Sequence, residues 1–162
     1  MSHKLDKIDE QIIRLLQEDG RMPAVEIARR LDNGITERMV RFRLKKMQQD
    51  GVIRISAVLN AEKVGYPVTA DVWVEVEGGQ VMEIARQLAQ LPQVCYVALS
   101  TGEIDISLQV RARDNLELHH IVTNHISTVP GVKKATMVIL PRILMDIHEW
   151  RIPLNATEQS QP

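Results

Sequence analysis

Hydrophobic residues in the first 50 positions recur with the spacing of α-helices, and turn-forming residues divide them into segments. The pattern predicts three short helices, over residues 6–19, 23–32 and 36–50. Asp6 and Thr36 stand where a side-chain oxygen can cap the first and third of them. The first part of the chain is therefore expected to be helical.

A β-branched segment, residues 52–59, follows the third helix directly and predicts a strand. Helix, short helix, turn, helix and strand is the element order of a winged helix-turn-helix domain, to which we assign residues 1–59. Residues 60–67 contain Gly65-Tyr66-Pro67, which breaks the periodicity and predicts a linker.

From residue 68 onward the pattern changes to strict alternation, which is typical of strands with one buried face. Strand-like and helix-like runs follow in the order β-α-β-β-α-β, over residues 68–76, 81–91, 94–101, 104–110, 114–126 and 132–140. This order predicts a ferredoxin-like sandwich as the second domain, residues 68–152. The fold class is thus a mixed α/β (α+β) chain with a polar, disordered tail over residues 153–162.

Two features of this sandwich predict how it is covered. Residues 94–101 are apolar in both phases, which favours a central strand and makes Cys95 an inert, buried thiol. Two helices cover only one face of a four-stranded sheet, and Trp73 lies on the other face. We expect that open face to be covered by a second copy of the chain, in a homodimer.

Composition and charge refine the picture. The 162 residues are 44% hydrophobic and 25% charged, as in a folded protein. The net charge is −1, but positive and negative side chains are distributed unevenly along the chain. Residues 1–63 carry 13 Lys and Arg against 10 Asp and Glu, whereas residues 64–162 carry 7 against 11. The N-terminal domain is therefore the one suited to a polyanion. One cysteine and no signal-peptide or membrane-spanning run predict a cytoplasmic location.

The positive charge gathers on the third helix, opposite its apolar stripe of Val40, Leu44 and Met47. Residues 36–54 hold 6 basic and 2 acidic side chains. The predicted DNA-facing set is Thr36, Glu37, Arg38, Arg41, Phe42, Lys45, Lys46 and, on the wing, Arg54. Arginine meets guanine edges and lysine meets phosphates in a major groove, although charge alone equally fits a solvated helix face.

Phe42 and Arg43 are exceptions to this surface. Phe42 is the only phenylalanine of the chain and lies among the charges, so we expect it to contact a wing, a partner chain or a thymine methyl. Arg43 borders the apolar stripe, and a structural ion pair is its expected role.

No catalytic site is predicted. His119, His120 and His125 lie on one predicted helix, but metal ligands on an α-helix need separations of three or four, so we expect no metal site and no cofactor. Glu103 and Asp105 follow a turn, where they suit either a small cation or a solvated loop.

Taken together, these residues resemble the Lrp/AsnC, or feast/famine, family of prokaryotic transcription regulators. In the N-terminal domain the likeness rests on Leu5-Asp6-x-Ile8-Asp9, Leu15-Leu16-Gln17-x-Asp19-Gly20-Arg21, Glu26-Ile27-Ala28, Ile35-Thr36, Val40, Arg43-Leu44, Met47 and Gly51-Val52-Ile53. In the second domain it rests on Thr101-Gly102-Glu103-Ile104-Asp105, similar to the family's Gly-x-x-Asp signature, and on Val129-Pro130-Gly131-Val132.

The resemblance implies a regulator that binds double-stranded DNA, associated with the nucleoid, whose second domain forms dimers that assemble into tetramers or octamers. It also implies that an amino acid or a related small effector binds near Thr101, Gly102, Glu103 and Asp105. There an acidic loop suits an α-ammonium group, and the glycine permits close approach.

The sequence departs from the family pattern before the third helix, where residues 32–35 make the turn about two residues longer than usual. Operator preference therefore does not carry over. Two other functions remain open: a sirohaem-decarboxylase-like enzyme on the same fold, with His148 and the helix histidines as candidates, and an architectural DNA binder without an effector.

Overall fold

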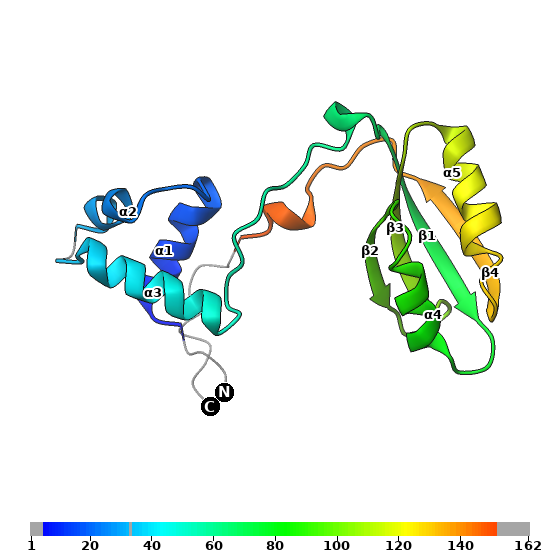
Figure 1. Ribbon diagram of the computed structural model, residues 1–162, viewed down its shortest axis with the longest axis horizontal. Coiled ribbons are helices and arrows are strands. Elements are labelled where there is room, and N and C mark those ends of the chain that lie inside the picture. The colour runs from blue at the N-terminus through cyan, green and yellow to red at the C-terminus, as the bar shows by residue number, and fades with distance from the viewer. Residues whose placement is uncertain (1–4, 33, 152–162) are drawn as a thin grey trace. The chain divides into compact units, whose positions relative to one another are not determined.

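The structure is a computed structural model that describes residues 5–32 and 34–151, and the chain falls into two compact units (Figure 1). Described residues up to Val58 and from Met145 onward form a helical unit, and Leu59–Leu144 form a unit built on a sheet. The sequence assigned residues 145–151 to the second domain, whereas contacts group them with the helices. The tail expected over residues 153–162 lies outside the described residues.

The helical unit contains α1 (Lys7–Glu18), α2 (Ala24–Leu31) and α3 (Glu37–Gln49). Asp6 caps α1 by accepting from the backbone N–H groups of Ile8 at 2.9 Å and Asp9 at 2.8 Å. Thr36 caps α3 through Oγ1, which accepts from Met39 N at 3.3 Å. Both predicted caps are confirmed, because each satisfies a backbone donor that the first helical turn leaves without a partner.

Aliphatic side chains from all three helices form the core of this unit. Ile12 of α1, Ile27 of α2, and Val40 and Met47 of α3 are fully buried. Val40 and Met47 belong to the apolar stripe predicted from the sequence, and burying them fixes which face of α3 points outward.

The strand predicted over residues 52–59 is absent from the described structure. Val52 and Ile53 donate from their backbone N–H groups to Met47 O, which ends α3, and no ladder follows. A strand needs a neighbouring strand to hydrogen-bond with, and the sheet of the described residues does not include this segment. The prediction was wrong because β-branched composition reports a preference for extended backbone, not the presence of a partner.

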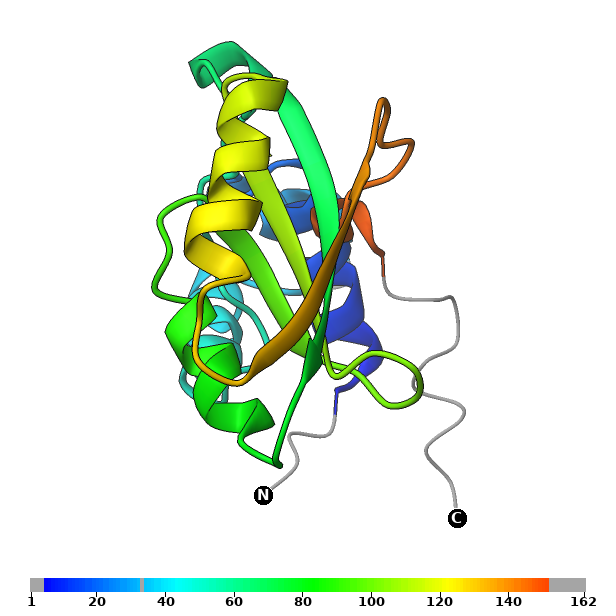
Figure 2. The same ribbon diagram turned by 90° about the vertical axis from the view of Figure 1, so that its right-hand side faces the viewer.

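The second unit is a four-stranded antiparallel sheet of β1 (Val68–Val76), β2 (Val94–Leu99), β3 (Ile106–Ala112) and β4 (Val132–Ile139), in the order β2-β3-β1-β4. Helices α4 (Val81–Leu88) and α5 (Asn115–Ile121) lie on one side of it (Figure 2). The predicted β-α-β-β-α-β order is confirmed. A short 3₁₀ turn, η1 (Glu62–Val64), precedes β1, and another, η3 (Ile147–Glu149), follows β4.

Alternation within the strands separates the two faces of the sheet. Ala70, Val72 and Val74 of β1 are fully buried under the helices, together with the inward residues of β3. The prediction of a central strand at residues 94–101 was wrong, because β2 pairs only with β3 and forms an edge. Cys95 is consequently exposed, not buried.

The face of the sheet without helices carries mostly polar side chains around Trp73, which is 40% exposed. Gln109 Nε2 donates to Asp71 Oδ1 at 3.2 Å, and Arg111 donates to Thr69 Oγ1. This open face is therefore mixed: hydrogen-bonded polar side chains surround Trp73, and the exposed Tyr96 and Val138 lie in register beside Gln109 and Asp71.

Candidate functional sites

The outward face of α3 carries a set of cations that are free to bind a ligand. Arg38, Lys45 and Lys46 are exposed, and none of them forms an ion pair with any residue in the described ranges. Phe42 lies on the same helix with 69% of its surface exposed. The structure thus brings together four of the residues predicted to face DNA, on the side of the helix opposite Val40 and Met47.

Two further residues of the predicted set, Glu37 and Arg41, are engaged with each other. Arg41 donates to Glu37 Oε1 from Nε at 2.8 Å and from Nη2 at 2.5 Å, one turn along α3. The spacing i,i+4 is the one at which opposite charges on a helix pair. The sequence led us to predict that both side chains face DNA. It did not lead us to predict that they pair with each other, although their i,i+4 spacing indicates this. Arg41 therefore presents a partly neutralised charge.

Arg43 has the structural role expected from the sequence. Its Nη1 donates to Asp6 Oδ2 at 2.7 Å and to Asp9 Oδ1 at 2.8 Å, so α3 is joined to the start of α1. Hydrogen bonds to Asp9 and Asp6 raise the pKa of Arg43, which stays charged in any case. This contact holds α3 in place behind its outward face.

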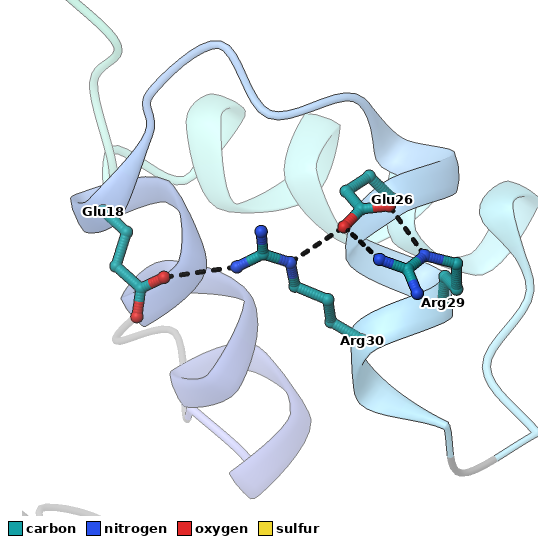
Figure 3. A network of polar contacts seen from close by, with 4 residues as sticks. All are labelled: Glu18, Glu26, Arg29 and Arg30. Atoms are coloured by element: carbon teal, nitrogen blue, oxygen red, sulfur yellow. Dashed lines mark hydrogen bonds and ion pairs between the residues drawn. The ribbon is translucent and has the colours of Figure 1, made fainter.

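Helix α2 adds little free charge to this surface, because Glu26 engages two arginines (Figure 3). Arg29 Nη2 lies 2.7 Å and Arg30 Nε 2.9 Å from Glu26 Oε1, and Arg30 Nη1 reaches Glu18 Oε2 of α1 at 3.4 Å. Hydrogen bonds from Arg29 and Arg30 lower the pKa of Glu26 to about 2, so its carboxylate is charged at neutral pH. The concentration of free cations is thus a property of α3.

The two remaining residues predicted to face DNA, Arg54 and Thr36, do not belong to the outward face of α3. Arg54 is exposed and without an ion pair in the described chain, but it lies in the extended segment after α3 and not on a wing strand. Thr36 uses its hydroxyl to cap α3, so its role is to begin the helix.

The loop between β2 and β3 contains the predicted effector residues. Thr101, Gly102 and Glu103 are exposed, and Gly102 has φ 129°, a conformation that favours glycine. Asp105 differs from them: its Oδ2 accepts from Val76 N at 2.7 Å, and its backbone N–H donates to Val74 O at 3.0 Å. The carboxylate of Asp105 therefore holds the loop against the end of β1, while Glu103 has no hydrogen bond or ion pair with another described residue.

The histidines and the cysteine form no larger cluster. No three His, Cys, Asp or Glu side chains of the described ranges are grouped so as to hold a metal ion. His120 and His125 contact each other edge to face, whereas His148 lies near Asp146 at 3.8 Å. In the part of the chain that the structure covers, no helix is both long enough and apolar enough to cross a bilayer.

Comparisons with known proteins match both units. An AsnC-type helix-turn-helix domain matches residues 5–48, and an Lrp/AsnC ligand binding domain matches residues 69–146. The chain is 37% identical over 141 residues to an uncharacterised HTH-type transcriptional regulator of Pyrococcus abyssi, across 86% of this chain and 88% of that protein. It is 34% identical over 138 residues to the HTH-type transcriptional regulator FL11 of Pyrococcus horikoshii, across 84% and 89% of the two chains.

Among solved structures, a transcriptional regulator from Neisseria meningitidis in complex with L-Met superposes with a TM-score of 0.83. The two are 27% identical, over 93% of this chain and 97% of that one. Both units, their order and the relatives agree, and the chain belongs to the Lrp/AsnC family of transcriptional regulators.

Proposed function

We propose that the protein binds specific DNA sequences through α3 and that its C-terminal unit binds an amino acid or a related small effector. The observation that carries the DNA-binding part is the outward face of α3, where Arg38, Lys45 and Lys46 are exposed and form no ion pair with a residue of ranges 5–32 and 34–151. A helix of this kind fits the major groove, with arginine directed at guanine edges and lysine at phosphates.

Each residue of this surface has a distinct role in the proposal. Arg38 lies in the first turn of α3, the part of a recognition helix that reaches base edges. Lys45, Lys46 and Arg54 contact the phosphate backbone and set affinity more than specificity. Phe42, exposed beside them, supplies apolar contact with a thymine methyl.

The test is DNA binding by the double variant Arg38→Ala/Lys45→Ala, measured by fluorescence anisotropy at several salt concentrations. We expect weaker binding, a salt slope reduced by about 1 for the lost phosphate contact of Lys45, and weaker discrimination between sequences from the loss of Arg38. The matched control is Lys63→Ala/Arg86→Ala, which removes two exposed cations from the sheet unit and should leave both quantities unchanged. Equal effects of the two double variants would contradict the assignment to α3.

The effector part of the proposal rests on the loop after β2 and on the match of residues 69–146 to a ligand binding domain. Glu103 offers a free carboxylate for an α-ammonium group, and the backbone at Gly102 and Thr101 is accessible to a carboxylate. The relative from Neisseria meningitidis is described with L-Met, which supports an amino acid as the class of effector.

Calorimetric titration with each of the twenty amino acids tests this part. Glu103→Gln should lower the affinity for the amino acid that binds, by about tenfold for a lost charge-assisted hydrogen bond. Glu83→Gln, which changes an exposed carboxylate on α4, is the control. If none of the twenty binds, the architectural, effector-free alternative is favoured instead. No structural observation favours a sirohaem decarboxylase.

The proposed assembly is a homodimer through the open face of the sheet, with further association of dimers into tetramers or octamers. Trp73, exposed among polar side chains on that face, is the support for it. Two copies would present two α3 helices to a pseudo-palindromic site. Trp73→Glu should lower the mass measured by analytical ultracentrifugation, whereas Met82→Glu on α4 should not; an unchanged mass for Trp73→Glu would exclude this interface.

A further inference from the structure

We propose that His120, near the end of α5, and His125, in the turn that follows it, bind a divalent late transition metal ion such as Zn²⁺. Both side chains are exposed, while Leu118, Ile121 and Ile126 of the same segment are buried against the sheet. The pair therefore lies on the solvent side of this segment. Imidazole nitrogens are ligands that suit Zn²⁺, Ni²⁺ and Cu²⁺.

A local change of helical geometry brings the two histidines together. Residues Val122–Ile126 form a π-turn, η2, in which Ser127 N donates to Val122 O at 2.9 Å, five residues back. In an α-helix residues five apart point in different directions, about 140° apart around the axis. A turn closed by hydrogen bonds that span five residues winds less per residue, which reduces the angle between His120 and His125. The expectation that no metal site forms assumed a regular α-helix, and the π-turn removes that assumption.

The separation of the two rings fits a shared metal ion. Their centroids are 5.2 Å apart and their planes are inclined by 72°. Two imidazoles on one tetrahedral ion, each with a metal–nitrogen distance of about 2.1 Å, have centroids about 5 Å apart. Only small rotations of two exposed rings are then needed for both to coordinate.

Asn124 supports one of the two ligands. Its amide nitrogen Nδ2 lies 2.8 Å from His120 Nδ1. A 180° rotation of the amide exchanges nitrogen and oxygen, so that Oδ1 accepts the Nδ1 proton and the lone pair of Nε2 is available to a metal. Partners of this kind fix the tautomer and the orientation of metal-bound histidines. The segment thus provides two ligands and a residue that orients one of them.

Two protein ligands leave coordination positions for water or for a group on another molecule. No third His, Cys, Asp or Glu of the described residues completes a cluster with them. The ion therefore binds reversibly at a surface site and plays no part in holding the fold together.

The test is isothermal titration of the full chain with ZnCl₂ in a background that carries His3→Ala and His148→Ala. This background leaves only His119, His120 and His125 of the five histidines. We expect one ion per chain. His120→Ala and His125→Ala should each weaken binding at least about tenfold, and Asn124→Ala by a smaller factor.

His119→Ala is the matched control, because it removes an exposed imidazole next to the pair, and it should change the affinity less than twofold. Nitrogen-15 spectra of the rings give a second readout, in which Zn²⁺ shifts Nε2 of His120 and leaves its Nδ1 protonated. Absence of binding, or equal loss in His119→Ala and His120→Ala, overturns the proposal. Because the substituted side chains from His119 onward are exposed, circular dichroism should show the same fold for every variant.

Discussion

Arg43 of α3 donates from Nη1 to Oδ1 of Asp9 in α1 at 2.8 Å, and it reaches Asp6 Oδ2 from the same nitrogen at 2.7 Å. Asp9 is buried, and Asp6 also caps α1. One guanidinium therefore connects the beginning of the first helix with the middle of α3. The outward face of α3 depends on this contact for its orientation, although Arg43 does not belong to that face.

Replacing Arg43 with alanine should lower the free energy of unfolding by about 2 kcal/mol, because it removes charge-assisted hydrogen bonds from a buried carboxylate. It should also weaken DNA binding without changing the salt slope, since no phosphate contact is lost. Chemical denaturation and anisotropy titrations measure the two effects. Arg21→Ala, which removes an exposed arginine of the same unit, is the control and should change neither. A reduced salt slope in Arg43→Ala would instead place this residue at the DNA.

The same contact makes stability depend on pH at the acid end. Burial alone would raise the pKa of Asp6, but hydrogen bonds from Asp9 N and Arg43 outweigh it and lower the pKa below the ordinary 3.8. A carboxyl whose pKa is lower in the folded state stabilises the fold above its unfolded pKa and loses that contribution as the pH falls. Unfolding curves should therefore show a loss of stability below about pH 4. Asp6→Asn should reduce that pH dependence; an unchanged dependence would contradict the role of Asp6.

Most of the architecture could be predicted from the sequence, because the spacing of hydrophobic residues shows which face of each helix and strand is buried. Val40 and Met47 identified the buried side of α3, and alternation in residues 68–76 identified the faces of β1. Predictions that depend on which strand lies beside another were less successful. The composition of residues 52–59 does not reveal whether a partner strand is present. An apolar run such as residues 94–99 has the same pattern in an edge strand as in a central strand of a sheet.

The functional residues show the same division. Arg43 was correctly assigned to an ion pair from its position beside the apolar stripe. The free cations of α3 follow from helical phase, but the engagement of Asp105 with Val76 N depends on contacts 29 residues apart, which no local pattern encodes. The π-turn near His120 and His125 likewise could not be predicted from a helical period of 3.6 residues per turn.

Glu37 restrains Arg41, and Glu37→Gln should therefore strengthen binding to DNA of random sequence. The change frees the guanidinium and removes a negative charge from the surface that we propose faces phosphates. We expect the salt slope to rise by about 1, measured by anisotropy on a random duplex between low and moderate salt. Glu62→Gln removes an exposed carboxylate outside α3 and serves as the control. Weaker binding by a correctly folded Glu37→Gln would show that the pair itself is needed at the DNA.

Substitutions of Asp105 and of Glu103 should differ in their effect on stability. Asp105→Ala removes the acceptor of Val76 N and should cost about 1–2 kcal/mol of unfolding free energy. Asp105→Asn keeps an acceptor oxygen and should cost less. Glu103→Ala, at an exposed position, should leave thermal stability unchanged. Thermal unfolding without effector measures all three; equal stability of Asp105→Ala and Glu103→Ala would show that the contact with β1 contributes nothing.

Gly131 occupies the turn before β4 with φ 89°, and its carbonyl accepts from Glu77 N at 2.8 Å. A Cβ at this position would lie 2.8 Å from Cδ1 of Ile84, which is buried in α4. Gly131→Ala should therefore destabilise the fold both by backbone strain and by crowding the core, about 2–3 kcal/mol in total.

Gly79→Ala separates these two causes, because Gly79 has a similar φ of 78° but no atom within 4 Å of an added Cβ. It carries only the strain and should cost about 1 kcal/mol. Chemical denaturation measures both variants. The difference between them reports how firmly Ile84 is held against the turn. Equal losses would mean that Ile84 moves aside freely and that the close approach at Gly131 contributes nothing to the requirement for glycine.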